Sequence, residues 1–150
     1  LLFNKNEIST KLFLNCDKLL KISFLPTITS IDDYAFDGCA SLNEVILSPS
    51  VTIIGEGAFR GCSALKKIII PSQVSSIGKA SFSKCFSLEE VIFEKFSSLT
   101  VINMLAFSGC SSLKQIYIPS SVDSIGHLAF QQCFSLKNVL FHSNIKSIGF

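Results

Sequence analysis

Six cysteines are the side chains of this sequence with the widest chemical range, because a thiol can form a disulfide, bind zinc or act as a nucleophile. They recur at a nearly constant interval, as Cys16, Cys39, Cys62, Cys85, Cys110 and Cys133. The successive separations are 23, 23, 23, 25 and 23 residues. A period in this range indicates a solenoid of stacked repeats, in which every cysteine occupies the same position.

The other groups that could do chemistry do not form a recognisable site. The two histidines, His127 and His142, stand at a turn and at the end of an expected strand. Asp32, Asp33 and Glu56 stand where helices are expected to start, and stabilisation of a helix N-terminus explains them. The sequence has no glycine-rich phosphate loop, nucleophile elbow or metal-ligand pair. We therefore expect no enzyme, no bound metal and no cofactor.

Charge and hydropathy exclude several classes of partner. The 150 residues include 13 basic and 11 acidic side chains, which give a net charge of +2, and 48% are hydrophobic. This balance provides no basic face for nucleic acid. The longest apolar run, Met104 to Phe107, is far shorter than the about 18 residues that a membrane-spanning helix needs. We expect no nucleic-acid partner and no membrane insertion within this segment.

The elements that position the cysteines repeat with them. A phenylalanine stands three residues before each cysteine and a leucine three residues after it: Phe13, Phe36, Phe59, Phe82, Phe107 and Phe130, and Leu19, Leu42, Leu65, Leu88, Leu113 and Leu136. An isoleucine marks each repeat boundary. We expect one domain over residues 1–150, with six full repeats over about 8–147 and partial repeats at both ends. Because both ends fall inside a repeat, we expect a fragment of a longer protein.

Each repeat predicts a strand, a second extended piece and a short helix. Residues 113–118 alternate as a half-buried strand does, and Pro119 ends that strand. A shorter extended piece is expected before the next boundary. Over 31–39, apolar residues recur every four positions, which predicts a helix with one buried face. Gly38 suits the left-handed C-terminal cap of that helix.

Stacking of such repeats gives the fold class. No single repeat can bury its apolar face, whereas repeats stacked about 4.8 Å apart lay like residues over like. We predict an α/β solenoid, a right-handed superhelix of 23-residue repeats with stacked parallel strands and short helices or turns opposite them. Parallel side chains then hold the cysteine Cβ atoms near the strand spacing rather than the about 3.8 Å of a disulfide. We expect buried free thiols, with a disulfide framework as the alternative.

The repeat resembles a known family. The segments 76–91 and 124–139, with Ala-Phe or Ser-Phe before cysteine and Ser-Leu after it, are similar to the BspA-like (Treponema pallidum-type) leucine-rich repeat. The resemblance covers essentially the whole chain. Departures are few: Ser81 replaces an alanine, and Lys84 and Gln132 replace a glycine. The resemblance implies a cell-surface or secreted protein of a bacterium or parasitic protist, used in adhesion and host contact.

The outward side of the strands is the candidate binding surface. Charge alternates between neighbouring coils through Lys66, Lys67, Glu89, Glu90 and Lys114. Cross-strand ion pairs that fix the strand register explain this pattern, and contacts with a partner are the alternative. Seven residues after cysteine, five consecutive coils present a bulky apolar residue, namely Ile46, Ile69, Ile92, Tyr117 and Leu140. Such a stripe indicates an interface, and strand propensity alone is the alternative explanation.

The interval of 25 residues marks a local insertion. Two extra residues enter near 94–98, directly after a strand, and bring Phe96 with them. Insertions in solenoids often lie on the binding face, so Phe96 joins the candidate partner-binding residues. A tolerated insertion is the alternative, because a longer surface loop costs little free energy.

These features favour a non-enzymatic protein–protein interaction module. The resemblance implies a leucine-rich-repeat adhesion protein that binds a host or matrix surface protein through its strand face. A structural spacer and an intracellular scaffold are the alternatives. Self-association, either end to end or through the apolar stripe, is a further possibility.

Overall fold

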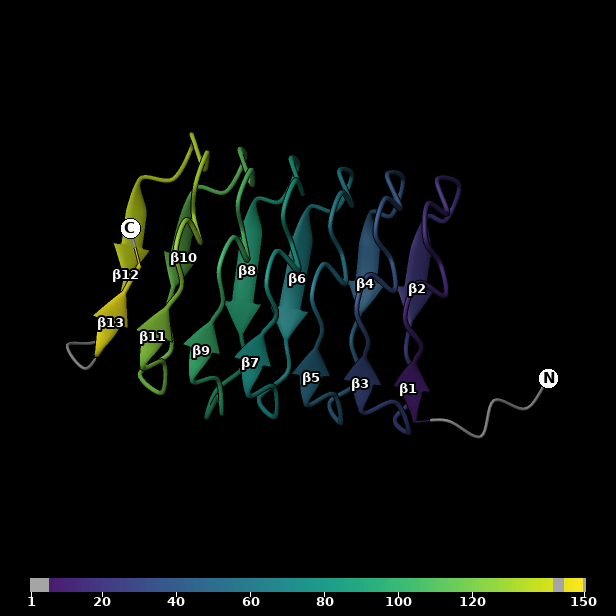
Figure 1. The fold of residues 1–150 in the computed structure, drawn as a ribbon, viewed down its shortest axis with the longest axis horizontal. Helices are drawn as coiled ribbons and strands as arrows, with labels where there is room; N and C mark the ends of the chain where they lie inside the picture. Colours follow the sequence, from purple (N-terminus) through teal and green to yellow (C-terminus); the bar gives the residue numbers. More distant parts are fainter. Residues whose placement is uncertain (1–5, 142–144, 150) are drawn as a thin grey trace.

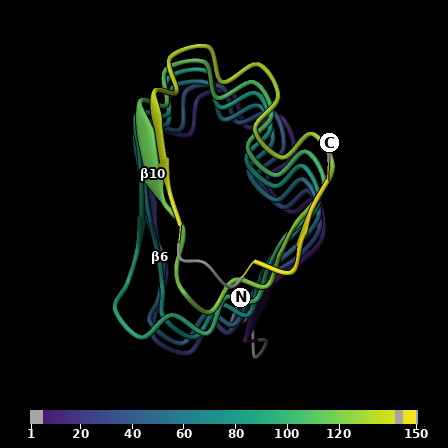
Figure 2. The same cartoon turned by 90° about the vertical axis from the view of Figure 1, so that its left-hand side faces the viewer.

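The chain forms a stack of coils, each of which carries short strands on its sides (Figure 1). The structure is a computed structural model that describes residues 6–141 and 145–149, so His142 lies outside the described residues. Viewed along the stack, successive coils superpose around a common interior (Figure 2). The N-terminal and C-terminal coils lie at opposite ends of the stack (Figure 1). The predicted stack of repeats is therefore confirmed.

Two sets of parallel strands run along the stack. The longer strands are β2 (Lys21–Ser23), β4 (Glu44–Ile46), β6 (Lys67–Ile70), β8 (Glu90–Phe93), β10 (Gln115–Tyr117) and β12 (Asn138–Leu140). The two-residue strands are β1 (Glu7–Ile8), β3 (Ser30–Ile31), β5 (Ile53–Ile54), β7 (Ser76–Ile77), β9 (Val101–Ile102), β11 (Ser124–Ile125) and β13 (Ser147–Ile148). The side formed by the longer strands is called the strand face below.

The two-residue strands form one parallel sheet of seven strands, in the order β1-β3-β5-β7-β9-β11-β13. Their register follows the sequence period, because Ile31 pairs with Ile54 and Ile54 pairs with Ile77. Ile77 in turn pairs with Ile102, across the interval of 25 residues. The two extra residues are therefore accommodated before β9 and do not shift the later coils.

The helix expected over 31–39 is wrong, since the chain forms consecutive turns there and the described residues contain no helix. The main-chain donors alternate between two directions. The N–H groups of Ala35 and Cys39 donate to carbonyls three residues earlier in the same coil, whereas those of Tyr34 and Phe36 donate to carbonyls of the next coil. An α-helix needs each N–H for the carbonyl four residues earlier. The fold is therefore a parallel β-solenoid rather than α/β.

Two positions in every coil have a left-handed main chain, which also prevents a helix. At the first position φ lies between 52° and 60°, in Lys11, Tyr34, Gly57, Ala80, Leu105 and Leu128. At the second, four residues later, φ lies between 56° and 80°, in Asn15, Gly38, Gly61, Lys84, Gly109 and Gln132. The left-handed conformation expected at Gly38 is correct, although no helix precedes it. A non-glycine residue in this conformation costs about 1–2 kcal/mol, so bonds between coils must hold it there.

The side chains expected to be buried line the interior. Ile31, Ala35, Phe36 and Cys39 are fully buried, although only Ile31 belongs to a strand. Phenylalanines of successive coils stack along the axis from Phe13 to Phe130, with ring centroids 5.0 to 5.6 Å apart and ring planes within 10° of parallel. Each aromatic pair contributes about 0.5–1.5 kcal/mol beyond the area that it buries. This ladder therefore ties neighbouring coils together.

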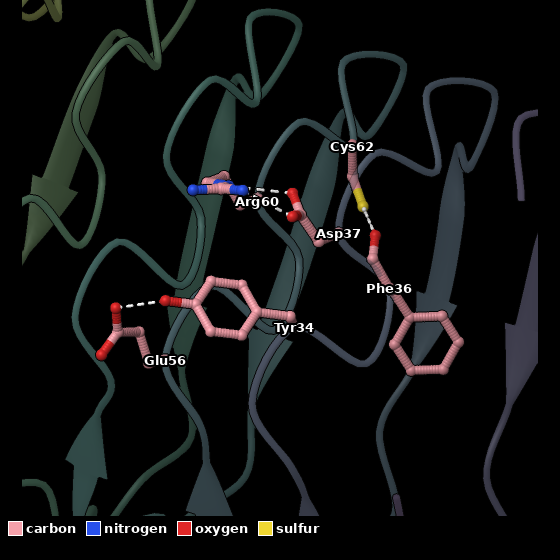
Figure 3. Close-up of polar contacts among 6 residues, drawn as sticks. All are labelled: Tyr34, Phe36, Asp37, Glu56, Arg60 and Cys62. Carbon is pink, nitrogen blue, oxygen red and sulfur yellow. Dashed lines mark hydrogen bonds and ion pairs between the residues drawn. The ribbon is translucent and has the colours of Figure 1, made fainter. Parts of the chain in front are cut away.

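All six cysteines are free thiols, as expected, but only four are buried, whereas Cys16 and Cys133 are partly exposed. The Sγ of Cys39 donates to the carbonyl oxygen of Phe13 at 3.0 Å, and the Sγ of Cys62 donates to that of Phe36 at 3.3 Å (Figure 3). The same bond to the preceding coil recurs at Cys85, Cys110 and Cys133. The thiols are therefore hydrogen-bonded parts of the core.

Burial suppresses the ionisation of these thiols. It raises the pKa of Cys39 and of Cys133 to about 11, from an ordinary value of 9.0. The pKa values of Cys62, Cys85 and Cys110 are raised further, because desolvation of these more deeply buried thiolates is larger. The thiolate is the nucleophilic and metal-binding form, so these cysteines are chemically inert in the folded chain.

We predict that stability decreases at alkaline pH because of these thiols. An unfolded thiol ionises near pH 9.0, whereas Cys39 and Cys133 keep their protons to about pH 11 when folded. Their contribution to the free energy of unfolding is complete below pH 9 and is lost as pH rises above it. Urea unfolding between about pH 8 and pH 10 measures the decrease. A chain with Cys39 and Cys62 replaced by alanine should show a shallower decrease, and equal slopes for the two chains would contradict the prediction.

We also predict that Ser81→Ala stabilises the chain. Ser81 is fully buried in a position that other coils fill with alanine, and its hydroxyl has no hydrogen-bond partner among the described residues. A buried hydroxyl without a partner costs about 1–3 kcal/mol, so its removal should raise the urea midpoint accordingly. Ser63→Ala is the matched control, because the Ser63 hydroxyl donates to the Ala40 carbonyl at 3.2 Å. A lower midpoint for Ser81→Ala would show that its hydroxyl is satisfied.

Candidate binding surface

The strand face carries the predicted apolar stripe. Side chains alternate along each strand, so Ile68 and Ile70 of β6 are buried while Ile69 between them is exposed. Three other stripe residues are exposed to a similar extent: Ile46 is 54% exposed, Tyr117 59% and Leu140 49%. Ile92 is less exposed than these three. All five therefore project from the strand face, and Ile92 contributes the least surface.

The strand face is divided into three parallel pairs of strands, β2–β4, β6–β8 and β10–β12. Within the pairs, Ile69 is level with Ile92 and Tyr117 with Leu140. Neighbouring pairs lie side by side without ladder pairing, and shallow hollows open between them. A hollow of about 200 Å³ between β4 and β6 is lined by Ile46 and Ile69, and one of about 250 Å³ between β8 and β10 is lined by Ile92 and Tyr117. The stripe residues thus form the walls of two hollows.

Ion pairs between coils border the stripe. The Nζ of Lys67 lies 2.8 Å from Oε2 of Glu90, and the Nζ of Lys114 lies 2.7 Å from Oε2 of Glu89. Both pairs join the neighbours that the alternation of charge predicted. The hydrogen bond from Lys114 lowers the pKa of Glu89, and the nearby charge of Lys66 has a smaller effect in the same direction. The Glu89 carboxylate therefore stays ionised and paired at neutral pH.

Glu44 pairs with the preceding coil, because its Oε2 lies 2.7 Å from Nζ of Lys21. It also lines one hollow together with Lys66 and Lys67 of the next coil. Within the described residues Lys66 makes no ion pair. Lys66 thus remains available to an acidic group of a partner.

The insertion loop, residues 94–98, projects at the end of β8 beyond the outline of the other coils (Figure 2). The preceding coil holds its base on both sides, because the Ser72 N–H donates to Glu94 Oε2 at 3.0 Å and the Ser98 N–H donates to the Ser72 carbonyl at 2.7 Å. Phe96 at the tip is left-handed, with φ of 57°, and is 96% exposed. The structure therefore presents Phe96 to solvent on a tethered loop.

A polar cluster that sequence reasoning missed lies on the turns (Figure 3). The Tyr34 hydroxyl donates to Glu56 Oε1. Arg60 donates from Nε and Nη2 to the two carboxylate oxygens of Asp37, at 2.9 and 2.6 Å, and its guanidinium lies 5.3 Å from the centroid of the Tyr34 ring. Gly57 makes room for that ring, because a Cβ there would come within 2.5 Å of a Tyr34 ring carbon.

The cluster is internally satisfied. The hydrogen bond with Glu56 raises the pKa of Tyr34, and the same bond lowers the pKa of Glu56. Asp37 raises the pKa of Arg60. Since these groups bind one another, the cluster joins coils rather than forming a binding site. The sequence does contain an indication of this cluster, because Asp37 and Arg60 are opposite charges one 23-residue repeat apart.

Two further exposed aromatic residues were also missed. Phe86 and Phe134 directly follow Cys85 and Cys133, and they are 50% and 82% exposed. They lie away from the stripe, outside the strands of the strand face. Their signal in the sequence is a large apolar residue where other coils carry Asp17, Ala40 or Ser63.

Residues with catalytic or metal-binding chemistry are dispersed. In the part of the chain that the structure describes, no His, Cys, Asp and Glu side chains gather in threes as metal ligands would. His127 is exposed, as predicted. Over 6–141 and 145–149, no helix is long and apolar enough to cross a membrane.

Comparison with known proteins identifies the repeat. The family described as BspA type leucine rich repeat region matches in six copies, over residues 6–98 and 95–150. No curated protein matches the chain.

Solved structures share the architecture. A leucine rich cell surface protein from Faecalibacterium prausnitzii is 30% identical, with a TM-score of 0.69 over 90% of this chain and 42% of that one. A T. pallidum leucine rich repeat protein, TpLRR, is 25% identical, with a TM-score of 0.61 over 87% of this chain and 71% of that one. The pneumococcal vaccine antigen PcpA is 24% identical and shows the fold alone, with a TM-score of 0.80 over 92% of this chain and 36% of that one.

This chain spans less than half the length of the Faecalibacterium and pneumococcal proteins. The matching proteins are leucine-rich repeat proteins, a repeat fold used for protein interaction. The six matched copies extend over residues 6–150 and carry the phenylalanine, cysteine and leucine positions that form the core. The chain therefore belongs to the BspA-type leucine-rich repeat family.

Proposed function

We propose that the chain binds a partner protein through its strand face. The observation that carries this proposal is the stripe of Ile46, Ile69, Ile92, Tyr117 and Leu140, which lies on the strand face in successive coils. Exposure of apolar side chains to water is unfavourable, so a continuous row of them favours a surface that is covered in the functional state. Tyrosine is enriched among residues that dominate binding energy, so Tyr117 is the expected anchor.

The charged border gives the stripe the arrangement of a protein interface, in which a polar rim surrounds an apolar centre. Within each of the pairs Lys67–Glu90 and Lys114–Glu89, the opposite charges neutralise each other beside the stripe. Lys66 is the exception and adds a positive charge next to Ile69. The proposed partner surface is therefore apolar at its centre, with an acidic group facing Lys66.

Adhesion at the cell surface is part of the same proposal. Its support is that the Faecalibacterium relative is described as a cell surface protein. A spacer that displays other domains and an intracellular scaffold are the competing functions, and self-association through the stripe is the competing use of the face.

We predict that substitutions in the stripe abolish capture of a partner. The immobilised chain is exposed to host-cell surface extract beside the double variant Ile69→Ser, Tyr117→Ser. Both residues are about half exposed, 44% and 59%, so the variant should keep the circular dichroism spectrum of the parent. Loss of an anchor residue should reduce capture roughly tenfold or more.

The control is Phe134→Ser, which removes a more exposed aromatic residue, 82% exposed, outside the strand face. Capture that is lost in the double variant and kept in the control supports the proposal. Equal capture by parent and double variant rejects the strand face as the binding surface. If the parent captures nothing, the spacer function replaces the proposal. Sedimentation of the parent above monomer mass, together with monomer mass for the double variant, assigns the stripe to self-association.

A further inference from the structure

A groove runs between β8 and β10 and ends under the insertion loop. The hollow between these strands is lined by Glu90, Val91, Ile92, Phe93, Gln115 and Tyr117. A second hollow, of about 350 Å³, is lined by residues 93–97 and 117–121. Because both hollows are lined by Phe93 and Tyr117, they form one depression, which we call the loop groove.

Three aromatic residues border the loop groove. Phe93 is half-buried at its centre, Tyr117 is 59% exposed on one side, and Phe96 is 96% exposed on the insertion loop. The bonds from Ser72 and Ser98 hold the base of that loop, so Phe96 needs little ordering when a ligand arrives. The groove thus has aromatic walls that are largely in place without a ligand.

Several side chains of the loop groove can donate a hydrogen bond to a ligand, and Gln115, Tyr117 and Ser121 among them can also accept one. Ser121 lines the groove, and its hydroxyl is buried without a hydrogen-bond partner among the described residues. Lys95 contributes an ammonium, which only donates. The one carboxylate at the loop end, that of Glu94, already accepts the Ser72 N–H at 3.0 Å. A ligand rich in acceptors therefore finds donors along the groove.

The strands of the loop groove offer no ladder to a ligand. β8 pairs with β6 and β10 pairs with β12, and β8 and β10 still lie in contact with each other, which leaves no space for a strand between them. Recognition must therefore use side chains. The straight part of the groove, from Gln115 to Pro119, extends for about 13 Å, which accommodates about four residues of polyproline II helix.

We propose that the loop groove binds a proline-rich extended segment of the partner protein. Proline has no N–H, so such a segment brings carbonyl acceptors and apolar rings, the complement of aromatic walls with spare donors. The Gln115 amide and the Tyr117 hydroxyl, which line the groove, can donate to such carbonyls. The preformed polyproline II helix loses little entropy on binding. This inference rests on the proposed protein-binding function and names the partner chemistry at one part of the strand face.

Proline decamer is the probe. The ¹⁵N-labelled 150-residue chain is titrated with it in an NMR experiment, with a glycine-serine decamer as the control peptide and cellohexaose as a hydroxyl-rich ligand. We expect the proline decamer to shift the amide signals of residues 93–97, 117–118 and 120–121 and to leave the turns around Phe134 unchanged. We expect Phe96→Ser to weaken binding roughly tenfold, as loss of an aromatic anchor does, and Phe134→Ser to leave it unchanged.

Three results would overturn the inference. The first is no shift with the proline decamer, and the second is equal shifts with the glycine-serine decamer. The third is a shift of these residues by cellohexaose alone, which would assign the groove to a glycan.

Failure of this inference is distinguishable from failure of the proposed function. If the Ile69→Ser, Tyr117→Ser variant loses partner capture while Phe96→Ser keeps it and excess proline decamer does not compete, the strand face binds a protein and the loop groove does not bind proline.

Discussion

Main-chain hydrogen bonds between neighbouring coils are the interaction on which the rest of the structure depends. They hold the turns as well as the strands, as in the bond of 2.8 Å from the Phe36 N–H to the Ala58 carbonyl. They fix the spacing at which phenylalanine rings stack 5.0 to 5.6 Å apart and thiols reach the preceding coil. At Gly78 the coils approach so closely that a Cβ would lie 2.4 Å from the Gly55 carbonyl oxygen. The core and the strand face both follow from this spacing.

Much of the fold could be predicted because each coil repeats the same burial pattern. The period located the core residues, including Ile31, Phe36 and Cys39, all fully buried. The helix could not be excluded from the sequence, because burial of every fourth residue fits two structures. One is a helix, and the other is a series of turns whose main-chain N–H groups donate alternately within the coil and to the next coil. The left-handed positions that decide between them are not confined to glycine, and at Tyr34 and Leu105 nothing in the residue type indicates a positive φ.

The candidate site was predictable to the extent that strands alternate. Alternation placed Ile69 and Tyr117 outside, and opposite charges one repeat apart gave the ion pair of Lys67 with Glu90. The hollows could not be predicted, since they depend on where ladder pairing is interrupted, and the sequence of β8 differs little from that of other strands. The hydrogen bond that holds the insertion loop to Ser72 could not be predicted either. It joins the Glu94 side chain to the Ser72 main chain of the preceding coil, and only the fold brings these two groups together.

The insertion loop concerns two properties of the fold, the length of a surface loop and the packing of the core. Ile77 pairs with Ile102 as Ile54 pairs with Ile77, so the coil that carries the longer loop contributes to the sheet like its neighbours. Loop length at the end of a strand and packing of the core are therefore independent variables. Selection can change the length and sequence of such a loop in one coil without a compensating change in the next. Recognition can diversify coil by coil in this architecture while stability stays constant.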